Sequence, residues 1–385
     1  MSSEPPPRQV PPSAEAIRDA FDGAAAYTVG LEDEVMLLDP ETLRLVPRAT
    51  EVLGRLGGDA RFKLEFPASQ VEILTRPMPD VPAAVAALLQ SRRDLAKAVD
   101  GRVRLAAAGF HPFSPALGEL NDTPRYAHTR HEYGSIAARQ LVCALQVHVA
   151  VGSADRALAV YNGLRAHLPA LAALAANAPF YEGRDAGLAS VRPKIGELLP
   201  RQGVPPAIES WEDYAEALRW GVAAGALPSH AAWWWELRPH PTFGTLELRV
   251  PDGQTTVAEA AAVAAVAQAL VAWLGARHDA GESLAPAPTW RIEENRWSAC
   301  RHGVEGAMAD LRTGERRPTR EVLNALLDAL APSAADLGAA AELERARGLV
   351  EVNGAMRQRD IAADRGVAGL AEWLAESFVQ ESPAA

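Results

Sequence analysis

The stretch YTVGLEDEVMLL, residues 27–38, decides the fold class because apolar residues recur in it at every second position. This alternation is typical of a β-strand, in which successive side chains point to opposite faces of a sheet. The apolar residues would lie on one face, and Glu32 and Glu34 would lie together on the other. The sequence therefore predicts a strand with two neighbouring carboxylates on its polar face.

Three further stretches show the same division into one apolar and one polar face. A solvated face is the ordinary explanation, since antiparallel sheets commonly have one side in water. Lysine, however, is missing from all four stretches, and carboxylates, an imidazole, amides and a guanidinium stand out instead. The polar members are Gln70 and Glu72 in 69–76, Gln146 and His148 in 141–151, and Glu247 and Arg249 in 245–250.

Carboxylates that converge on one face repel each other, and they remain together when cations neutralise them. Mg²⁺ prefers oxygen ligands and typically links protein carboxylates to substrate phosphates. The sequence therefore favours a magnesium site on this face. Neither G-x-x-x-x-G-K-[ST] nor a G-x-G-x-x-G after a strand occurs, which disfavours the common nucleotide-binding folds. H-E-x-x-H is also missing, and His128 and His131 lack a carboxylate pattern suited to zinc.

The composition provides ample material for a large core, since 48% of the 385 residues are hydrophobic. The formal net charge of -11 argues against nucleic acid as a partner, because nucleic-acid binding needs a basic surface. Only two cysteines occur, so we expect no disulfide framework and a cytoplasmic location. The alanine-rich run 256–276 contains Glu259 and Gln268, which favours a buried helix over a membrane span.

The order of segments predicts an α+β fold, with a mainly antiparallel sheet flanked by helices, because neighbouring strands look like hairpins. Residues 1–13 are rich in proline and predict a disordered tail. No linker divides residues 14–385, so we expect a single catalytic domain whose C-terminal part is helical. Further expectations are a hairpin return over 43–47, a strand pair over 61–66 and 69–76, helices over 79–100 and 123–140, and a long loop over 181–206.

The ordered set of polar residues resembles the metal and nucleotide site of the glutamine synthetase / glutamate–cysteine ligase superfamily. The set consists of E-x-E, two more glutamates, a histidine and E-x-R. More narrowly, the chain is similar to the type 2 glutamate–cysteine ligase family, the bacterial carboxylate–amine ligases. The similar segments are VGLEDEVMLLDPET, SQVEILT, RYAHTRHEYGSIAARQLVCALQVHV, LPALAALAANAPFYEGRDAGLASVR, WWWELRPHPTFGTLELRVPDGQTTV and ENRWSACRHG.

The resemblance implies a glutamine synthetase-like catalytic domain with a curved sheet, and a ligase that uses ATP and two or three Mg²⁺ ions. The carboxylate of an amino acid would attack the γ-phosphoryl group to give an acyl phosphate and ADP. An amine would then displace phosphate and form an amide, most simply from glutamate and cysteine or another amine. Small molecules are therefore the expected partners, together with further copies of the chain in a homo-oligomer, a dimer being favoured.

The resemblance also assigns roles to individual residues. Arg249, Arg192 and Arg238 are implied as catalytic groups, and Arg249, Arg238 and Arg301 as nucleotide-binding groups, since a guanidinium suits phosphate and carboxylate. The implied metal ligands are Glu32, Glu34, Glu72, His148 and Glu247, and Glu65 is a further candidate. Asn177 and Asp185 are expected to line the acceptor side. Trp233, Trp234 and Trp235 are expected to pack in the core and at the sheet edge, with stacking on adenine as the alternative.

One departure from the family pattern concerns the strand 141–151. Family members commonly show H-V-H where this chain has Gln146, Val147 and His148. Gln146 keeps an amide that can form hydrogen bonds, but it cannot act as an imidazole would.

Two other functions stay open at this point. A guanidino kinase uses the same type of catalytic sheet and would stop at a phosphoguanidine. A degenerate ligase could instead serve as a ligand-binding or scaffold protein. The first alternative predicts no amide product, and the second predicts no Mg²⁺-dependent binding of ATP.

Overall fold

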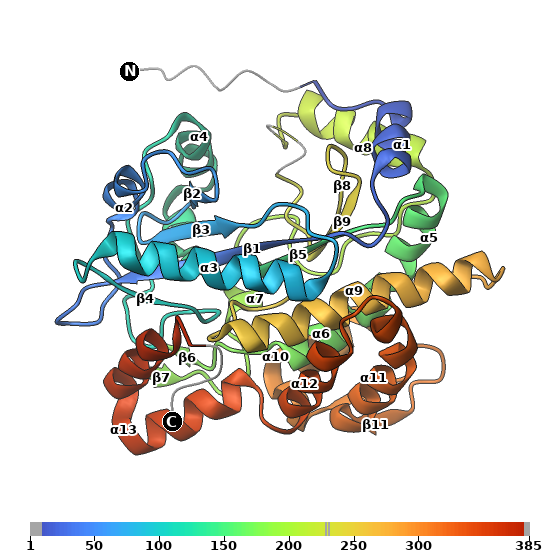
Figure 1. Cartoon of the computed structure of the whole chain (residues 1–385). Coiled ribbons are helices and arrows are strands. Elements are labelled where there is room, and N and C mark those ends of the chain that lie inside the picture. The colour runs from blue at the N-terminus through green and yellow to red at the C-terminus, as the bar shows by residue number, and fades with distance from the viewer. Residues whose placement is uncertain (1–9, 228, 230–231, 381–385) are drawn as a thin grey trace.

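An antiparallel sheet runs through the middle of the protein (Figure 1), whose computed structural model describes residues 10–227, 229 and 232–380. Within these residues seven strands form the sheet in the order β2-β3-β1-β5-β9-β8, with β4 paired to β1. All its pairs are antiparallel, which confirms the predicted α+β class. The strands are β1 Val29–Leu38, β2 Phe62–Leu64, β3 Gln70–Leu74, β4 Arg104–Ala106, β5 Leu145–Ala150, β8 Leu237–His240 and β9 Thr245–Leu248.

Two long helices, α3 (Val81–Val99) and α9 (Val257–Asp279), pack against the apolar side of the sheet (Figure 1). The Asp80 carboxylate caps the start of α3, and a capping box of Thr256 and Glu259 starts α9. The other helices are α1 Ala14–Gly23, α2 Ala49–Arg55, α4 Pro124–Tyr133, α5 Ala154–Leu164, α6 Leu168–Leu174, α7 Arg192–Gly196, α8 Trp211–Ala223, α10 Thr289–His302, α11 Thr319–Asp336, α12 Ala340–Glu351 and α13 Gly354–Ser377.

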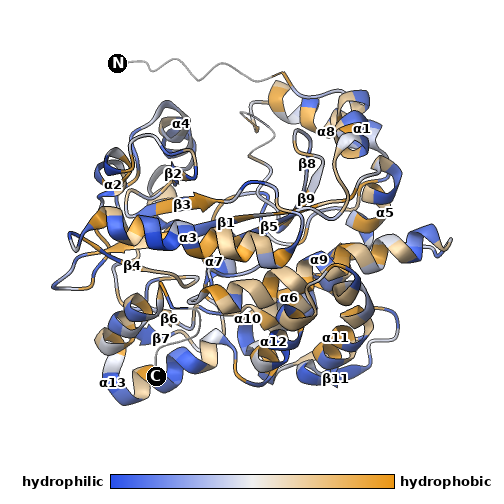
Figure 2. Ribbon diagram, in the orientation of Figure 1, coloured by the Kyte–Doolittle hydropathy of each residue, from blue (hydrophilic) through white to orange (hydrophobic). Residues whose placement is uncertain are grey.

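Helix α9 forms the centre of the helical half of the molecule. By length and composition alone it could cross a membrane, but 89% of its most apolar window is buried inside the protein. It contacts α3, α5, α11 and α12, and Figure 2 shows its hydrophobic colouring in the midst of these helices. The buried helix expected over 256–276 is therefore confirmed.

A buried ion pair joins the sheet to these helices. Asp33 on β1 points away from the carboxylate face, and Arg92 on α3 binds it through two hydrogen bonds of 2.8 and 3.1 Å. Both side chains are fully buried. The same guanidinium donates to the carbonyls of Gln254 and Thr255, just before α9, and to the carbonyl of Phe378, just after α13. It therefore links β1 to the segments that precede and follow the C-terminal helices.

The expected hairpin return over 43–47 is confirmed only in part, since the chain turns back antiparallel to β1 but forms no extended strand. Among the described residues it shrinks to a single bridge between Leu38 and Leu45. The Asp39 carboxylate accepts hydrogen bonds from the turn, and Leu43 takes a positive φ of 57°, so extended geometry is not sustained.

The expected long loop over 181–206 is also partly wrong, because it contains regular structure. Strand β6 (Phe180–Tyr181) pairs with β7 (Arg184–Asp185), and the short helix α7 follows. The helix expected over 123–140 ends early, at Tyr133, where Gly134 adopts a φ of 56° and a 3₁₀ turn begins.

The chain after residue 253 is mainly helical, as expected, but a hairpin of β10 (Ala307–Ala309) and β11 (Arg316–Pro318) interrupts it. Most of the predicted disordered tail, residues 1–9, lies outside the described residues.

Candidate active site

The antiparallel register brings polar residues from four strands onto one side of the sheet. Directly opposite residues in such a ladder point to the same face and lie close enough to interact. Residues from both halves of the chain therefore meet, as the alternation of the sequence predicts. The register pairs Glu34 with Glu72, Glu32 with Gln146, and His148 with Glu247.

Six of these side chains form two groups with the geometry of metal sites. The histidine triad consists of Glu32, His148 and Glu247, and the glutamate triad consists of Glu34, Glu65 and Glu72. Within each triad, one ligand atom from every residue lies within 4.8 Å of the others. The structure thus brings together all five residues implied as metal ligands, together with the further candidate Glu65.

The histidine triad is held by hydrogen bonds on both ring nitrogens of His148. Nε2 lies 3.1 Å from Glu32 Oε1 and 4.0 Å from Glu247 Oε2, and Nδ1 lies 3.0 Å from Thr245 Oγ1. A partner on the second ring nitrogen fixes the orientation of a metal-binding imidazole. His148 is therefore oriented toward the two carboxylates.

The glutamate triad places like charges together away from water. Burial, and next the charge of Glu65, raise the pKa of Glu34 to about 8. Burial and the charges of Glu32 and Glu65 also raise the pKa of Glu72 well above its ordinary value. Full ionisation of this triad thus requires a cation, and carboxylate oxygens with a nearby imidazole suit Mg²⁺ or Mn²⁺.

Two arginines lie beside the histidine triad. Arg238 binds the fully buried Glu247 through two hydrogen bonds of 2.7 and 2.9 Å, and Arg249 donates to the same carboxylate. Burial opposes ionisation of Glu247, but the two guanidinium groups outweigh it and lower the pKa of this carboxyl. Glu247 therefore stays ionised without a metal, unlike Glu34.

A polar cavity of about 340 Å³ lies over this face of the sheet. Its lining includes Glu32 and Glu34, and two other cavities share lining residues with it. An apolar cavity of about 370 Å³ shares Glu32 and Phe243 with the polar one, and is otherwise lined mainly by aliphatic side chains. The cavities therefore offer apolar, metal-binding and charged surfaces in succession.

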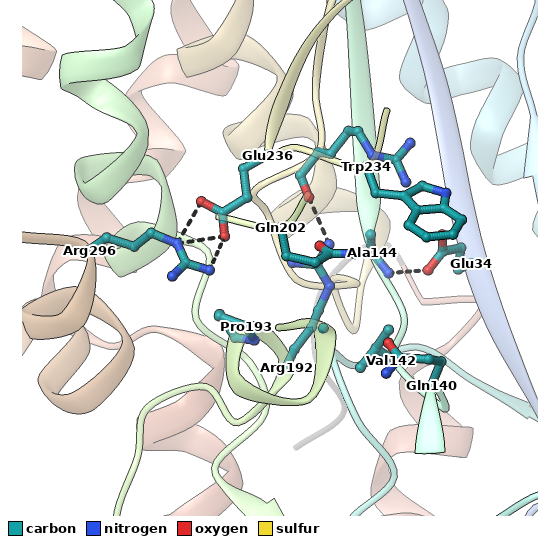
Figure 3. Close-up of a pocket in the computed structure, with 12 residues that line it drawn as sticks. Glu34, Gln140, Val142, Ala144, Arg192, Pro193, Gln202, Trp234, Glu236 and Arg296 are labelled. Atoms are coloured by element: carbon teal, nitrogen blue, oxygen red, sulfur yellow. Dashed lines mark hydrogen bonds and ion pairs between the residues drawn. The ribbon is translucent and has the colours of Figure 1, made fainter. Parts of the chain in front are cut away.

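The third, charged cavity is smaller, about 80 Å³, and shares Glu34 and Arg249 with the polar cavity. Figure 3 shows its lining, in which Arg296 binds Glu236 on the side away from Glu34. Arg192 also lines this cavity, and it donates to the carbonyls of Arg249 and Val250 at 2.7 and 3.1 Å. Arg192 is thus placed both at the cavity and behind the strand that carries Arg249.

Other residues singled out by the resemblance do not line these three cavities. Arg301 is exposed and donates to the Gly187 carbonyl. Asp185 is exposed and pairs with Arg359 at 2.8 Å. Asn177 is buried, and its amide group donates to the Gly253 carbonyl at 2.8 Å.

Sequence reasoning missed several cavity residues. Trp234, expected first of all to pack, lines both the polar and the charged cavity. Phe243 is 59% exposed, an unusual fraction for a large aromatic residue, and stacks on His240 at 4.1 Å. Glu236 could have been found, because it precedes Arg238 at the spacing that keeps both residues on one strand face.

Comparison with known proteins adds a family to this geometry. A family model described as "Glutamate-cysteine ligase family 2 (GCS2)" matches residues 28–372, which is most of the chain. The chain belongs to this family. Its membership confirms the predicted relationship and the predicted ligase class.

Curated relatives agree over nearly their whole length. A protein of Rubrobacter xylanophilus named "Putative glutamate--cysteine ligase 2-3" is 38% identical over 367 residues, which cover 93% of this chain and 98% of the relative. A protein of Frankia casuarinae named "Putative glutamate--cysteine ligase 2-1" is 33% identical over 357 residues, which cover 90% and 93%.

Two solved structures share the fold of this family member. Glutamate–cysteine ligase of Francisella tularensis in complex with AMP has a TM-score of 0.65 at 10% identity, covering 93% of this chain and 90% of that one. A bifunctional glutathione synthetase from Pasteurella multocida also has a TM-score of 0.65, at 16% identity, covering 95% and 53%. At these identities the likeness concerns the fold.

Proposed function

We propose that the protein is an ATP-dependent ligase that joins the carboxylate of an amino acid, such as glutamate, to an amine, such as cysteine. The observation that carries the proposal is the pair of triads on one sheet face, with arginines beside them and a cavity over them. The names of the relatives support this substrate class, and the AMP complex of the Francisella enzyme supports an adenine nucleotide as co-substrate.

The six triad residues would hold two or three Mg²⁺ ions between the protein and the phosphates of ATP. Such ions, when bound, neutralise phosphate oxygens and stabilise the charge that moves during phosphoryl transfer. The chain fits this role because three carboxylates of the glutamate triad converge within 4.8 Å, and burial with the charge of Glu65 raises the pKa of Glu34, so a cation there favours ionisation. Arg238 provides that neighbour permanently for Glu247.

In the proposed reaction, a carboxylate oxygen of the amino acid attacks the γ-phosphorus, and the bond from that phosphorus to the β,γ-bridging oxygen breaks. ADP and an acyl phosphate result. The amine nitrogen then attacks the acyl carbon, phosphate leaves with the original carboxylate oxygen, and the nitrogen loses a proton. Arg249 lies between the triads, where its guanidinium can stabilise the transferring phosphoryl group.

The two flanking cavities suggest how the substrates are arranged. The apolar cavity beside the histidine triad suits a purine base, with the exposed ring of Phe243 in its lining. The charged cavity beside the glutamate triad suits an amino acid, because side chains of both charge signs line it, among them Arg192 and the Glu236–Arg296 pair. Nε of Arg192 is buried without a hydrogen-bond partner among the described residues.

The test is a screen of amino acids and amines with purified protein, ATP and Mg²⁺, in which ADP and product mass are measured. We expect ADP release that requires both an amino acid and an amine, with an amide of the corresponding mass. A stable phosphorylated acceptor without amide would indicate a kinase. Failure of calorimetry to detect Mg²⁺-dependent ATP binding would indicate a scaffold protein, and either result contradicts the proposal.

A further inference from the structure

Gln146 is the side chain that connects the two triads. It lies on β5, between β1 and β9, and is 2% exposed. Its Nε2 donates to Glu34 Oε1 at 2.9 Å, and its Oε1 accepts a hydrogen bond from Arg249. Since Arg249 also donates to Glu247, a continuous chain of hydrogen bonds runs from the glutamate triad to the histidine triad.

An amide suits this position because it offers a donor at one end and an acceptor at the other. Both bonds are to groups that can carry charge, and such hydrogen bonds are about twice as strong as neutral ones. The partners also fix which end is which, since a guanidinium can only donate and an ionised carboxylate can only accept. An apolar side chain would leave both partners with an unmet hydrogen bond in a buried place.

The two contacts have different consequences for the site. The bond to Glu34 sets the direction of a carboxylate whose other oxygen is already fixed by the Ala144 amide, at 2.5 Å. The bond to Arg249 holds the guanidinium between the triads. Partners of metal ligands typically change metal affinity or activity by about 10–100-fold when they are removed.

We propose that Gln146 is a positioning residue that aligns Glu34 for metal binding and Arg249 for the phosphoryl group at the same time. The inference rests on the proposed function, and it adds a role for the residue at which this chain departs from H-V-H. Gln146 need not touch the metal in this role. It acts through Glu34 on metal affinity, and through Arg249 on the rate at saturating metal.

The test uses Gln146→Met, which keeps the length and flexibility of the side chain but removes the amide. Titration with Mn²⁺ without nucleotide, followed by electron paramagnetic resonance, measures metal affinity independently of turnover. We expect the affinity to fall by about 10–100-fold. In a Glu34→Ala background the same substitution should have less than a twofold effect, because the residue through which it acts is gone.

The second readout is kcat for ADP release at saturating Mg²⁺, which we expect to stay reduced by about tenfold or more, through the loss of the Arg249 contact. Gln268→Met is the matched control, since Gln268 is also fully buried, lies on α9, and donates one hydrogen bond, to the Tyr27 carbonyl at 2.8 Å. Gln268→Met should leave Mn²⁺ affinity and kcat unchanged. Thermal unfolding of every variant checks that the fold is kept. Gln146→Leu serves as a second variant without the amide if Gln146→Met does not fold.

Equal effects of Gln146→Met in the Glu34 and Glu34→Ala backgrounds would overturn the inference, because Gln146 would not act through Glu34. Unchanged Mn²⁺ affinity in a folded Gln146→Met protein would overturn it as well, while leaving the ligase proposal intact. Wild-type protein that binds no Mn²⁺ would overturn the metal site of the proposed function and this inference together.

Discussion

Glu34 on β1 and Glu72 on β3 lie directly opposite each other in the antiparallel ladder, so two carboxyl groups share one side of the sheet. Such a pair is unfavourable in a folded protein unless a proton or a cation separates the charges. Burial, and next the charge of Glu65, raise the pKa of Glu34 to about 8, and burial and the neighbouring glutamates, Glu34 among them, raise the pKa of Glu72. The protonation of these glutamates, the binding of a cation to them and the free energy of unfolding should therefore depend on one another.

The first prediction concerns pH and stability. Folded protein keeps a proton on Glu34 that the unfolded chain releases above the ordinary pKa of 4.5, so stability falls as pH rises from 4.5 through about 8. We expect the melting temperature of metal-free protein to fall across this range, and Mg²⁺ to raise it more at pH 8 than at pH 6. Glu34→Gln cannot ionise and should flatten the pH dependence. Identical pH slopes for wild type and Glu34→Gln would contradict this account.

The second prediction concerns turnover. Glu34→Gln should lower kcat for ADP release on the order of 100-fold, because one group that stabilises the reacting charges is lost. The requirement for Mg²⁺ should rise in parallel, as a titration of the rate with Mg²⁺ will measure. Glu41→Gln, in an exposed turn, is the control and should behave as wild type. Unchanged turnover in Glu34→Gln would remove this carboxylate from the metal site.

The third prediction concerns the opposite face of β1. Arg92→Met leaves the fully buried Asp33 without its partner, which should cost about 3–5 kcal/mol of the free energy of unfolding. Arg347→Met removes a partly exposed ion pair with Asp328 and should cost about 0–1 kcal/mol. Urea denaturation of both variants measures the difference. Equal costs would show that the ion pair between β1 and α3 has no special role.

The fourth prediction concerns Phe243, whose place in the lining of the apolar cavity is fixed by its neighbours. Its ring stacks on His240, and Gly244, with a φ of 61°, leaves no room for a Cβ against the Ala20 carbonyl. Phe243→Ala should raise KM for ATP about tenfold, since stacking on a base contributes about 1–3 kcal/mol.

The same Phe243→Ala substitution should change kcat little, because the contact is made before and during the reaction alike. Trp220→Ala, an exposed aromatic residue on α8, is the control. A change in kcat alone, with KM for ATP unaltered, would place the base elsewhere. Steady-state kinetics with ATP as the varied substrate distinguishes these outcomes.

The sequence predicts most of the site because strand alternation is a local property. Each of the four strands shows its polar face within a few residues, and the pairing of Glu34 with Glu72 then follows from adjacent strands. Glu65 was harder to place, because it lies beyond the end of β2, where alternation no longer applies.

Features that depend on packing between distant segments could not be read in the same way. The partner of Asp33 is known only from the packing of α3 against the sheet, because Arg92 lies 59 positions away in the sequence. Arg301 was predicted as a nucleotide-binding residue because its segment is similar to the family. The sequence of that segment does not indicate that Arg301 is exposed on α10. The cavities, and the role of Trp234 in two of them, likewise arise only from the assembled fold.

The central claim is that an amino-acid carboxylate is activated by transfer of the γ-phosphoryl group. Its most direct test uses the amino acid found in the screen, labelled with ¹⁸O in the reacting carboxylate, together with its amine, ATP and Mg²⁺. The account predicts that the phosphate released with the amide carries one ¹⁸O atom from that carboxylate. Amide formation with unlabelled phosphate would contradict it.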